Sequence, residues 1–137
     1  MFDRCIYFNL VTLTRRITRI WQEEFQKLGL SPSHGYLLFA VAEESPVSQK
    51  QLSEILELDA STVTRFVDKL ISMNLVEKSS VGKGGELSVT PRGRTVYKQV
   101  NRAMDDLYGR MQTHFGKREF RGFVRRLSAA KDSLESW

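Results

Sequence analysis

One short stretch of the chain, DASTVTRFVDKL at residues 59–70, carries side chains suited to contact with a polyanion. Its hydroxyls and bases are Ser61, Thr62, Thr64, Arg65 and Lys69. A hydroxyl can donate to a phosphate or meet a base edge, and the arginine fork matches the acceptor pair on the major-groove edge of guanine. A solvated helix face more often carries glutamate and lysine. The polar residues of this stretch therefore indicate a binding surface.

The apolar residues of the same stretch recur at helical spacing, which predicts an amphipathic helix. Its expected inner face consists of Val63, Phe66, Val67, Leu70 and Ile71. Asp59 is the expected N-cap, because its carboxylate can accept a hydrogen bond from a free backbone N–H of the first turn.

A shorter helix is predicted just before it, in SQKQLSEIL. Ser48 and Gln51 have the spacing of a capping box. The expected buried face consists of Leu52, Ile55 and Leu56. Gln49 and Lys50 open this helix and could hold a phosphate together with the positive end of its dipole. Only ELD separates the two helices, so the pair has the layout of a helix-turn-helix.

Further helices are predicted before this pair. Apolar residues recur every three or four positions from Ile6 onward, until Gly29 stops the pattern. A second helix starts with Ser31 as its N-cap and Pro32 at its first position, and it closes at Pro46.

After the helix-turn-helix the apolar pattern changes period. LVEKSS and ELSVT are typical of short strands, and the glycine-rich VGKGG between them predicts a β-hairpin. Thr90 and Pro91 suit the start of a long helix, which Gly116 separates from a last one. The predicted fold class is therefore mainly α with a small β-hairpin wing. We expect one domain over residues 1–137, with a winged helix-turn-helix at about residues 31–92.

The outer helices, at about residues 4–28 and 92–137, carry longer apolar stripes than a compact core obviously covers. A second copy of the chain could cover them in a two-fold dimer. Alternatively, the stripes pack on each other within one chain. Large aromatics near both chain ends favour dimerisation helices; they are Phe2, Phe8, Phe120, Phe123 and Trp137.

Composition excludes several classes of protein. The chain has 137 residues, of which 41% are hydrophobic and 27% charged, enough for a globular domain with a core. One cysteine rules out a disulfide framework, and two histidines without clustered carboxylates make a metal site or cofactor unexpected. No apolar run approaches the roughly 18 residues of a membrane span, and MFDRCIYFNL is a poor secretion signal. A cytoplasmic protein is expected.

The net charge of +5 fits a polyanion partner without requiring one. Residues 46–94 contain seven Lys/Arg and six Asp/Glu, whereas residues 95–137 contain nine and five. The positive excess therefore lies outside the predicted winged helix, and the placement of a few bases within it has to account for binding.

No catalytic constellation can be assembled from the sequence. A Ser/His/Asp set and paired catalytic carboxylates are both missing. The segment GKGG lacks the Gly-x4-Gly-Lys-Ser/Thr pattern of a phosphate loop and precedes a strand rather than a helix. The protein is not expected to be an enzyme.

Three segments, LSPSHGYLLFAVAE, LSEILELDASTVTRFVDKLISMNLVEK and LSVTPRGR, together resemble the MarR family of transcriptional regulators, and the resemblance covers nearly the whole chain. It implies a homodimer with a winged helix-turn-helix in each subunit, bound to palindromic operators in double-stranded DNA. It further implies a repressor that a small aromatic or lipophilic effector releases.

With the docking mode of helix-turn-helix proteins, eight residues are expected to bind DNA. They are Gln49, Lys50, Ser61, Thr62, Thr64, Arg65, Lys69 and Lys83. Arg65 is expected to reach a base, and Lys69 a phosphate. Two alternatives stay open. Ser61 and Thr62 also suit the start of any helix, and Arg65 could pair with Asp68 along its own helix.

The predicted wing departs from the family pattern. Family members commonly carry Asp-x-Arg shortly before the second strand, where this chain has Val81, Gly82 and Lys83. Lys83 keeps the charge but lacks the guanidinium fork, so weaker readout of groove shape is expected.

Two other functions remain open. Oxidant-sensing members of the family use a cysteine near the start of the first helix, and Cys5 lies close to that place but not at it. A redox-sensing regulator acting through Cys5 is one alternative, although a free cysteine in an apolar segment is more often simply buried. The other is a winged-helix module that binds proteins and has no DNA role.

Overall fold

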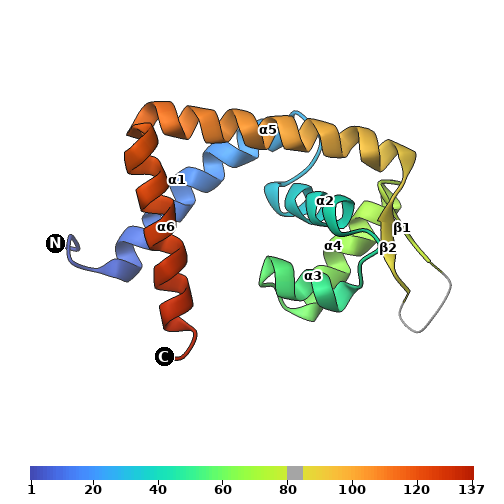
Figure 1. The fold of residues 1–137 in the computed structure, drawn as a ribbon, viewed down its shortest axis with the longest axis horizontal. Coiled ribbons are helices and arrows are strands. Elements are labelled where there is room, and N and C mark those ends of the chain that lie inside the picture. Colours follow the sequence, from blue (N-terminus) through green and yellow to red (C-terminus); the bar gives the residue numbers. More distant parts are fainter. Residues whose placement is uncertain (80–84) are drawn as a thin grey trace. The chain divides into compact units, whose positions relative to one another are not determined.

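The structure is a computed structural model that describes residues 1–79 and 85–137, so Val81, Gly82 and Lys83 lie outside the described residues. The described residues form six helices and one two-stranded antiparallel sheet (Figure 1), which confirms the predicted fold class. The elements are α1 (Ile6–Gln26), α2 (Pro32–Glu44), α3 (Gln49–Leu56), α4 (Ala60–Ser72), β1 (Val76–Lys78), β2 (Leu87–Val89), α5 (Pro91–Phe115) and α6 (Lys117–Leu134). The chain divides into two compact units, residues 1–101 and 102–137.

Side-chain caps begin the helices of the first unit where the sequence predicts them. Ser31 caps α2, and Ser48 and Gln51 make both hydrogen bonds of the capping box, at 3.1 and 2.9 Å. The carboxylate of Asp59 accepts a hydrogen bond from the Thr62 backbone N–H at 2.7 Å. Each cap satisfies a backbone donor that the helix leaves free, which fixes the first residues of α2, α3 and α4.

The core of the first unit lies where α2 contacts α3, α4 and β2. Its fully buried side chains include Leu37, Leu38 and Val41 of α2, Leu52 of α3, Val63, Val67 and Leu70 of α4, and Leu87 of β2. Removing each such side chain from water stabilises the fold by about 1.5–3 kcal/mol. This burial holds α3 and α4 together against α2.

The hairpin is joined to the helix-turn-helix through the backbone. β1 and β2 pair with Val76 opposite Val89 and Lys78 opposite Leu87. The N–H of Val47 donates to the Leu87 carbonyl at 3.1 Å, and the Leu87 N–H donates back at 2.7 Å. The segment that enters α3 is thereby attached to β2.

Thr90 connects the hairpin to α4 and α5. It is only 5% exposed; its hydroxyl donates to the Asn74 carbonyl at 2.7 Å and accepts from the Gly93 N–H at 2.9 Å. Its own N–H donates to the Leu75 carbonyl at 3.1 Å. Thr90 therefore caps α5, as the sequence predicts, and also fixes the segment that leaves α4.

Two residues expected on inner helix faces are exposed instead. Ile55 of α3 is 49% exposed and Ile71 of α4 is 38% exposed. Each lies in the last turn of its helix and at the edge of the apolar stripe, where the neighbouring elements do not cover it. The prediction of the inner faces was wrong at these two positions.

The second unit contains the end of α5 and all of α6. Gly116 separates the two helices at a φ of 91°, and Phe120 packs against Tyr108 and Phe115 with ring centroids 5.6 and 6.2 Å apart. No residue of α6 is buried. Exposed apolar side chains on or after this helix are Phe123, Val124, Leu127, Leu134 and Trp137.

No helix in residues 1–79 and 85–137 is long and apolar enough to cross a membrane.

Gly93 provides a test of the junction at Thr90. A Cβ at Gly93 would overlap the carbonyl oxygen of Leu75. We expect Gly93→Ala to destabilise the fold by about 1–3 kcal/mol, as overpacking does. Urea unfolding at fixed protein concentration measures the change. The control is Gly109→Ala within α5, where a Cβ meets nothing within 4 Å, and it is expected to stabilise by about 0.5–1 kcal/mol. A Gly93→Ala protein as stable as the parent would contradict the close approach to Leu75.

Candidate nucleic-acid interface

The turn between α3 and α4 determines which surface of the unit carries the candidate residues. Glu57 ends α3 in the left-handed conformation, with φ 53° and ψ 45°, and the Leu58 N–H donates to the Ser53 carbonyl at 3.1 Å. Asp59 then begins α4. The short turn places the first turns of both helices on one surface of the unit, since α3 and α4 pack on each other along their apolar sides.

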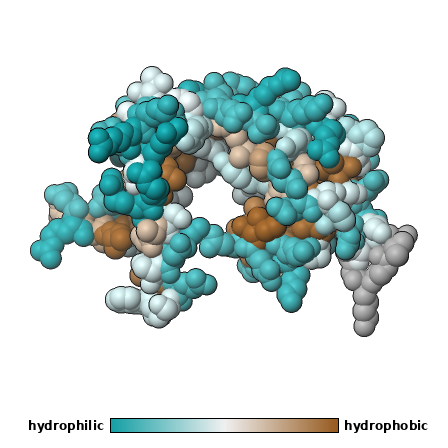
Figure 2. Space-filling model, viewed as in Figure 1, coloured by the Kyte–Doolittle hydropathy of each residue, from teal (hydrophilic) through white to brown (hydrophobic). Residues whose placement is uncertain are grey.

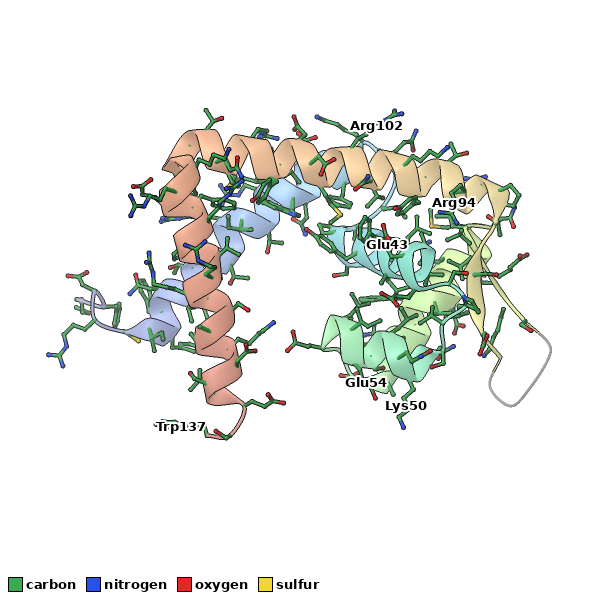
Figure 3. All side chains as sticks on the ribbon, in the orientation of Figure 1. Glu43, Lys50, Glu54, Arg94, Arg102 and Trp137 are labelled. Carbon is green, nitrogen blue, oxygen red and sulfur yellow. The ribbon has the colours of Figure 1, made fainter. Side chains whose placement is uncertain are left out.

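All candidates in the described residues reach the surface. Those that are exposed are Lys50, Ser61, Thr64, Arg65 and Lys69, and those that are half-buried are Gln49 and Thr62. Figure 3 shows the Lys50 side chain pointing away from α3. The wing residue Lys83 lies outside the described residues.

Asp59 organises the first turn of α4. It accepts the Thr62 N–H and, at 2.9 Å, the hydroxyl of Ser61. Hydrogen bonds from the Thr62 side chain and backbone, and then from Ser61, lower the pKa of Asp59. Ser61 therefore donates its proton within the chain, as expected for a residue at a helix start, and keeps only acceptor capacity for a ligand.

Gln49 and Thr64 bring α3 and α4 together at the candidate surface. The Thr64 hydroxyl lies 3.1 Å from the Gln49 side-chain carbonyl and 2.9 Å from the Ala60 carbonyl, so its one proton has two acceptors. Because the carbonyl of the Gln49 amide faces Thr64, its amide nitrogen is free to donate outward. The sequence identified both residues but not this contact.

The cations of the candidate surface form no ion pair within the described chain, although the charge of Arg65 contributes to the lowered pKa of Asp59. Among residues 1–79 and 85–137, none of Lys50, Arg65 and Lys69 forms an ion pair. The expected alternative for Arg65, a pair with Asp68, is not formed; its guanidinium carbon lies 5.8 Å from the centre of the Phe66 ring. These charges are therefore available to an anionic partner.

His34 is a neighbour of this surface that was not among the predicted site residues. Its ring lies 4.6 Å from that of Phe66, which joins the start of α2 to α4. Burial, and then the charge of Lys69, lower the pKa of His34. The helical spacing of the sequence gave no signal for this contact between elements.

Residues able to ligate a metal do not gather in the described part of the chain. No group of three or more His, Cys, Asp and Glu side chains lies close enough there to hold an ion.

A helix-turn-helix followed by a β-hairpin defines a winged helix, and solved structures share this fold over nearly the entire chain. A MarR/EmrR family transcriptional regulator from Acinetobacter sp. ADP1 is 18% identical with a TM-score of 0.84, covering 100% of this chain and 99% of its own. Staphylococcus aureus MarR in complex with salicylate and kanamycin is 15% identical, with a TM-score of 0.80 and coverages of 98% and 93%. The oxidised form of MarR from E. coli is 17% identical, with a TM-score of 0.73 and coverages of 91% and 93%.

The family match falls on the winged helix. Residues 28–85 match the MarR family. No curated protein matches the chain. Within the winged helix, residues 28–85 are therefore similar to the MarR family, and the chain has the fold of that family's transcriptional regulators, in agreement with the resemblance seen in its motifs.

The cap at Asp59 predicts a pH dependence. Because the pKa of Asp59 is lower in the folded than in the unfolded chain, the ionised carboxylate stabilises the fold above the ordinary carboxyl range. This stabilisation is lost as the pH falls through the lowered value. Asp59→Asn keeps a capping oxygen but does not ionise, so the parent's advantage in melting temperature is expected to shrink below about pH 4. Asp59→Ser is the control and should follow the same course. An advantage independent of pH would contradict this role for the charge.

Proposed function

We propose that the protein is a homodimeric, sequence-specific transcriptional regulator that binds a palindromic operator in double-stranded DNA and acts as a cytoplasmic repressor. The observation that carries this proposal is the exposed surface of α3 and α4. It presents Lys50, Arg65 and Lys69 with no ion pair among the described residues. The family of the winged helix and the regulator fold of the chain support the same function.

In this function the first half of α4 enters the major groove. Arg65 is exposed on that half, and its fork suits the acceptors of a guanine edge. Lys69 lies one turn further along α4, where it suits a phosphate. Lys50 and the Gln49 amide, oriented by Thr64, suit a phosphate at the start of α3. Thr62 and Thr64 allow close approach of the backbone to the groove.

A second copy of the chain would cover the apolar surface that a single chain leaves exposed. Figure 2 shows apolar surface on the N-terminal part of α1, where the exposed large side chains are Phe2, Ile6, Tyr7, Phe8 and Leu10. Such large apolar residues at solvent are typical of interaction surfaces. The exposed apolar side chains of α6 form another such surface; they are Phe123, Val124, Leu127 and Leu134. A two-fold dimer would also present two copies of α4 to the two halves of a palindrome.

The proposed signal is a small aromatic or lipophilic effector. Staphylococcus aureus MarR has been crystallised with salicylate, and its fold matches this chain at a TM-score of 0.80. An effector that alters the spacing of the two α4 helices would release DNA, since half-sites lie about one helical turn apart, roughly 34–36 Å.

A redox signal through Cys5 is the second candidate. Cys5 is exposed, and its sulfur caps α1 by accepting the Phe8 N–H at 3.4 Å. The E. coli MarR structure of similar fold is an oxidised form. If peroxide releases DNA and Cys5→Ser abolishes the release, this signal replaces the small effector.

Selection of bound duplexes from a random pool tests the proposed function. We expect two inverted half-sites whose centres lie about 10 base pairs apart. On the selected duplex, Arg65→Ala is expected to weaken binding by about 1–3 kcal/mol and to relax preference at one base position. Lys69→Ala is expected to weaken binding to all sequences alike and to lower the salt slope by about 0.9.

Arg19→Ala is the matched control, because it removes one exposed arginine on α1. Equal binding by the Arg65→Ala protein would show that Arg65 reads no base. Failure to select any duplex would favour a protein-interaction module.

If the protein is a dimer, light scattering is expected to give a mass of twice 15.8 kDa. Leu127→Glu places a charge on the apolar face of α6 and is expected to shift the mass toward one chain. The residue is 39% exposed in the single chain, so the change is not expected to disrupt folding. Ala129→Glu adds the same charge on the opposite face of α6, about 160° away at 100° per residue, and is expected to leave the dimer intact. A monomeric parent protein would contradict the proposed assembly.

A further inference from the structure

Four cationic residues gather at the corner between α5 and α6, in the second unit. Lys117, Arg118, Arg121 and Arg125 line a hollow of about 330 Å³. Binding sites for small molecules have volumes of about 300 Å³ and more, so the hollow is large enough for a small anion. None of these residues belongs to the proposed DNA-binding surface.

The four cations form a face of their own on α6. At 100° per residue they lie within an arc of about 100°. The apolar residues Phe123 and Leu127 lie well outside this arc and Val124 lies about 20° beyond its edge, and all three belong to the face assigned above to a second copy of the chain. The basic hollow therefore borders the proposed dimer face but is lined by none of its apolar residues.

The stretch of α6 from Lys117 to Arg125 contains one acidic residue. Among residues 1–79 and 85–137, none of the four cations forms an ion pair. The acid in the first turn of α6, Glu119, turns toward Gly116, where its carboxylate lies 2.8 Å from the place a Cβ would occupy. Like charges three and four residues apart on a helix repel one another, so a bound anion would relieve this repulsion.

α5 adds polar groups beside the cations. Side-chain interactions with Arg121 and then Gln112, followed by the charges of Arg121 and Lys117, lower the pKa of the Tyr108 phenol. The side-chain nitrogen of Gln112 is buried and forms no hydrogen bond of normal geometry, although it lies near that phenol oxygen. Tyr108 also packs its ring on Phe120, 5.6 Å between centroids, which holds these groups at the corner.

We propose that the corner formed by Lys117, Arg118, Arg121 and Arg125 is a binding site for a small phosphate-bearing anion. Guanidinium groups bind tetrahedral phosphate oxygens through paired hydrogen bonds, and the lysine adds a point charge. The phosphate can be free, as in pyrophosphate, or part of a mononucleotide. Three arginines and a lysine in one hollow suit two or more negative charges better than a single carboxylate. This site does not depend on the proposed DNA function.

Calorimetric titration of the full chain with pyrophosphate, at constant ionic strength and without DNA, tests the site. Saturable binding is expected, and the Arg121→Gln/Arg125→Gln protein should bind roughly tenfold more weakly or worse. Arg15→Gln/Arg16→Gln is the matched control, because it removes two exposed arginines from α1 and should leave binding unchanged. A parallel titration with AMP distinguishes the two sources: tighter binding of AMP indicates a nucleotide, and tighter binding of pyrophosphate indicates a free phosphate.

A second variant and a spectroscopic signal keep the test independent of folding. Lys117→Gln/Arg118→Gln leaves the Arg121 contact with Tyr108 in place and should weaken binding similarly. With ring-labelled tyrosine, pyrophosphate should shift the NMR signal of Tyr108 more than that of Tyr97.

The site is refuted if pyrophosphate and AMP both fail to saturate, or if the control loses as much affinity as the variants. It is also refuted if the variants lose duplex binding while pyrophosphate binding is unchanged, because the cations then serve DNA. The proposed operator binding is measured separately, so either proposal can fail alone.

Discussion

The hydrogen bonds of Thr90 are the constraint on which the first unit depends. Asn74 ends the α4 segment in the left-handed conformation, at φ 58°, and its carbonyl then accepts the buried Thr90 hydroxyl. The same hydroxyl caps α5 through Gly93, and the Leu75 carbonyl accepts the Thr90 N–H. A buried carbonyl without such a partner is costly, so these bonds fix one geometry for the end of α4, the hairpin and α5.

The polar residues of α4 fall into two groups: some stabilise the fold, and others remain available to a ligand. Asp59 and Ser61 bond each other and the first turn, while Thr64 bonds Gln49 across the turn. Arg65 and Lys69 are left without ion pairs in the described chain. The hydroxyls therefore serve mainly to shape and orient the surface, and the long cations are the groups that can reach a nucleic acid in the proposed function.

The outer helices show how one helix can present two unlike surfaces. α6 buries no residue, and its apolar side chains and its four clustered cations occupy different faces. Removing the apolar side chains from water favours covering their face with another apolar surface. Repulsion among the four cations favours binding of an oxyanion on theirs. The proposed dimer and the proposed phosphate site therefore do not compete for the same residues.

The sequence by itself determined the helix starts at Ser31, Ser48 and Asp59, the hairpin, the break at Gly116 and the set of candidate residues. These depend on caps, turns and periodicity, which act over a few neighbouring residues. The tertiary structure alone decided that Ile55 and Ile71 stay exposed, that Thr64 meets Gln49, and that Arg65 lies over Phe66 rather than pairing with Asp68. It also brought Tyr108 beside Arg121. Such outcomes depend on which elements pack together and where their ends fall, and local spacing does not specify that.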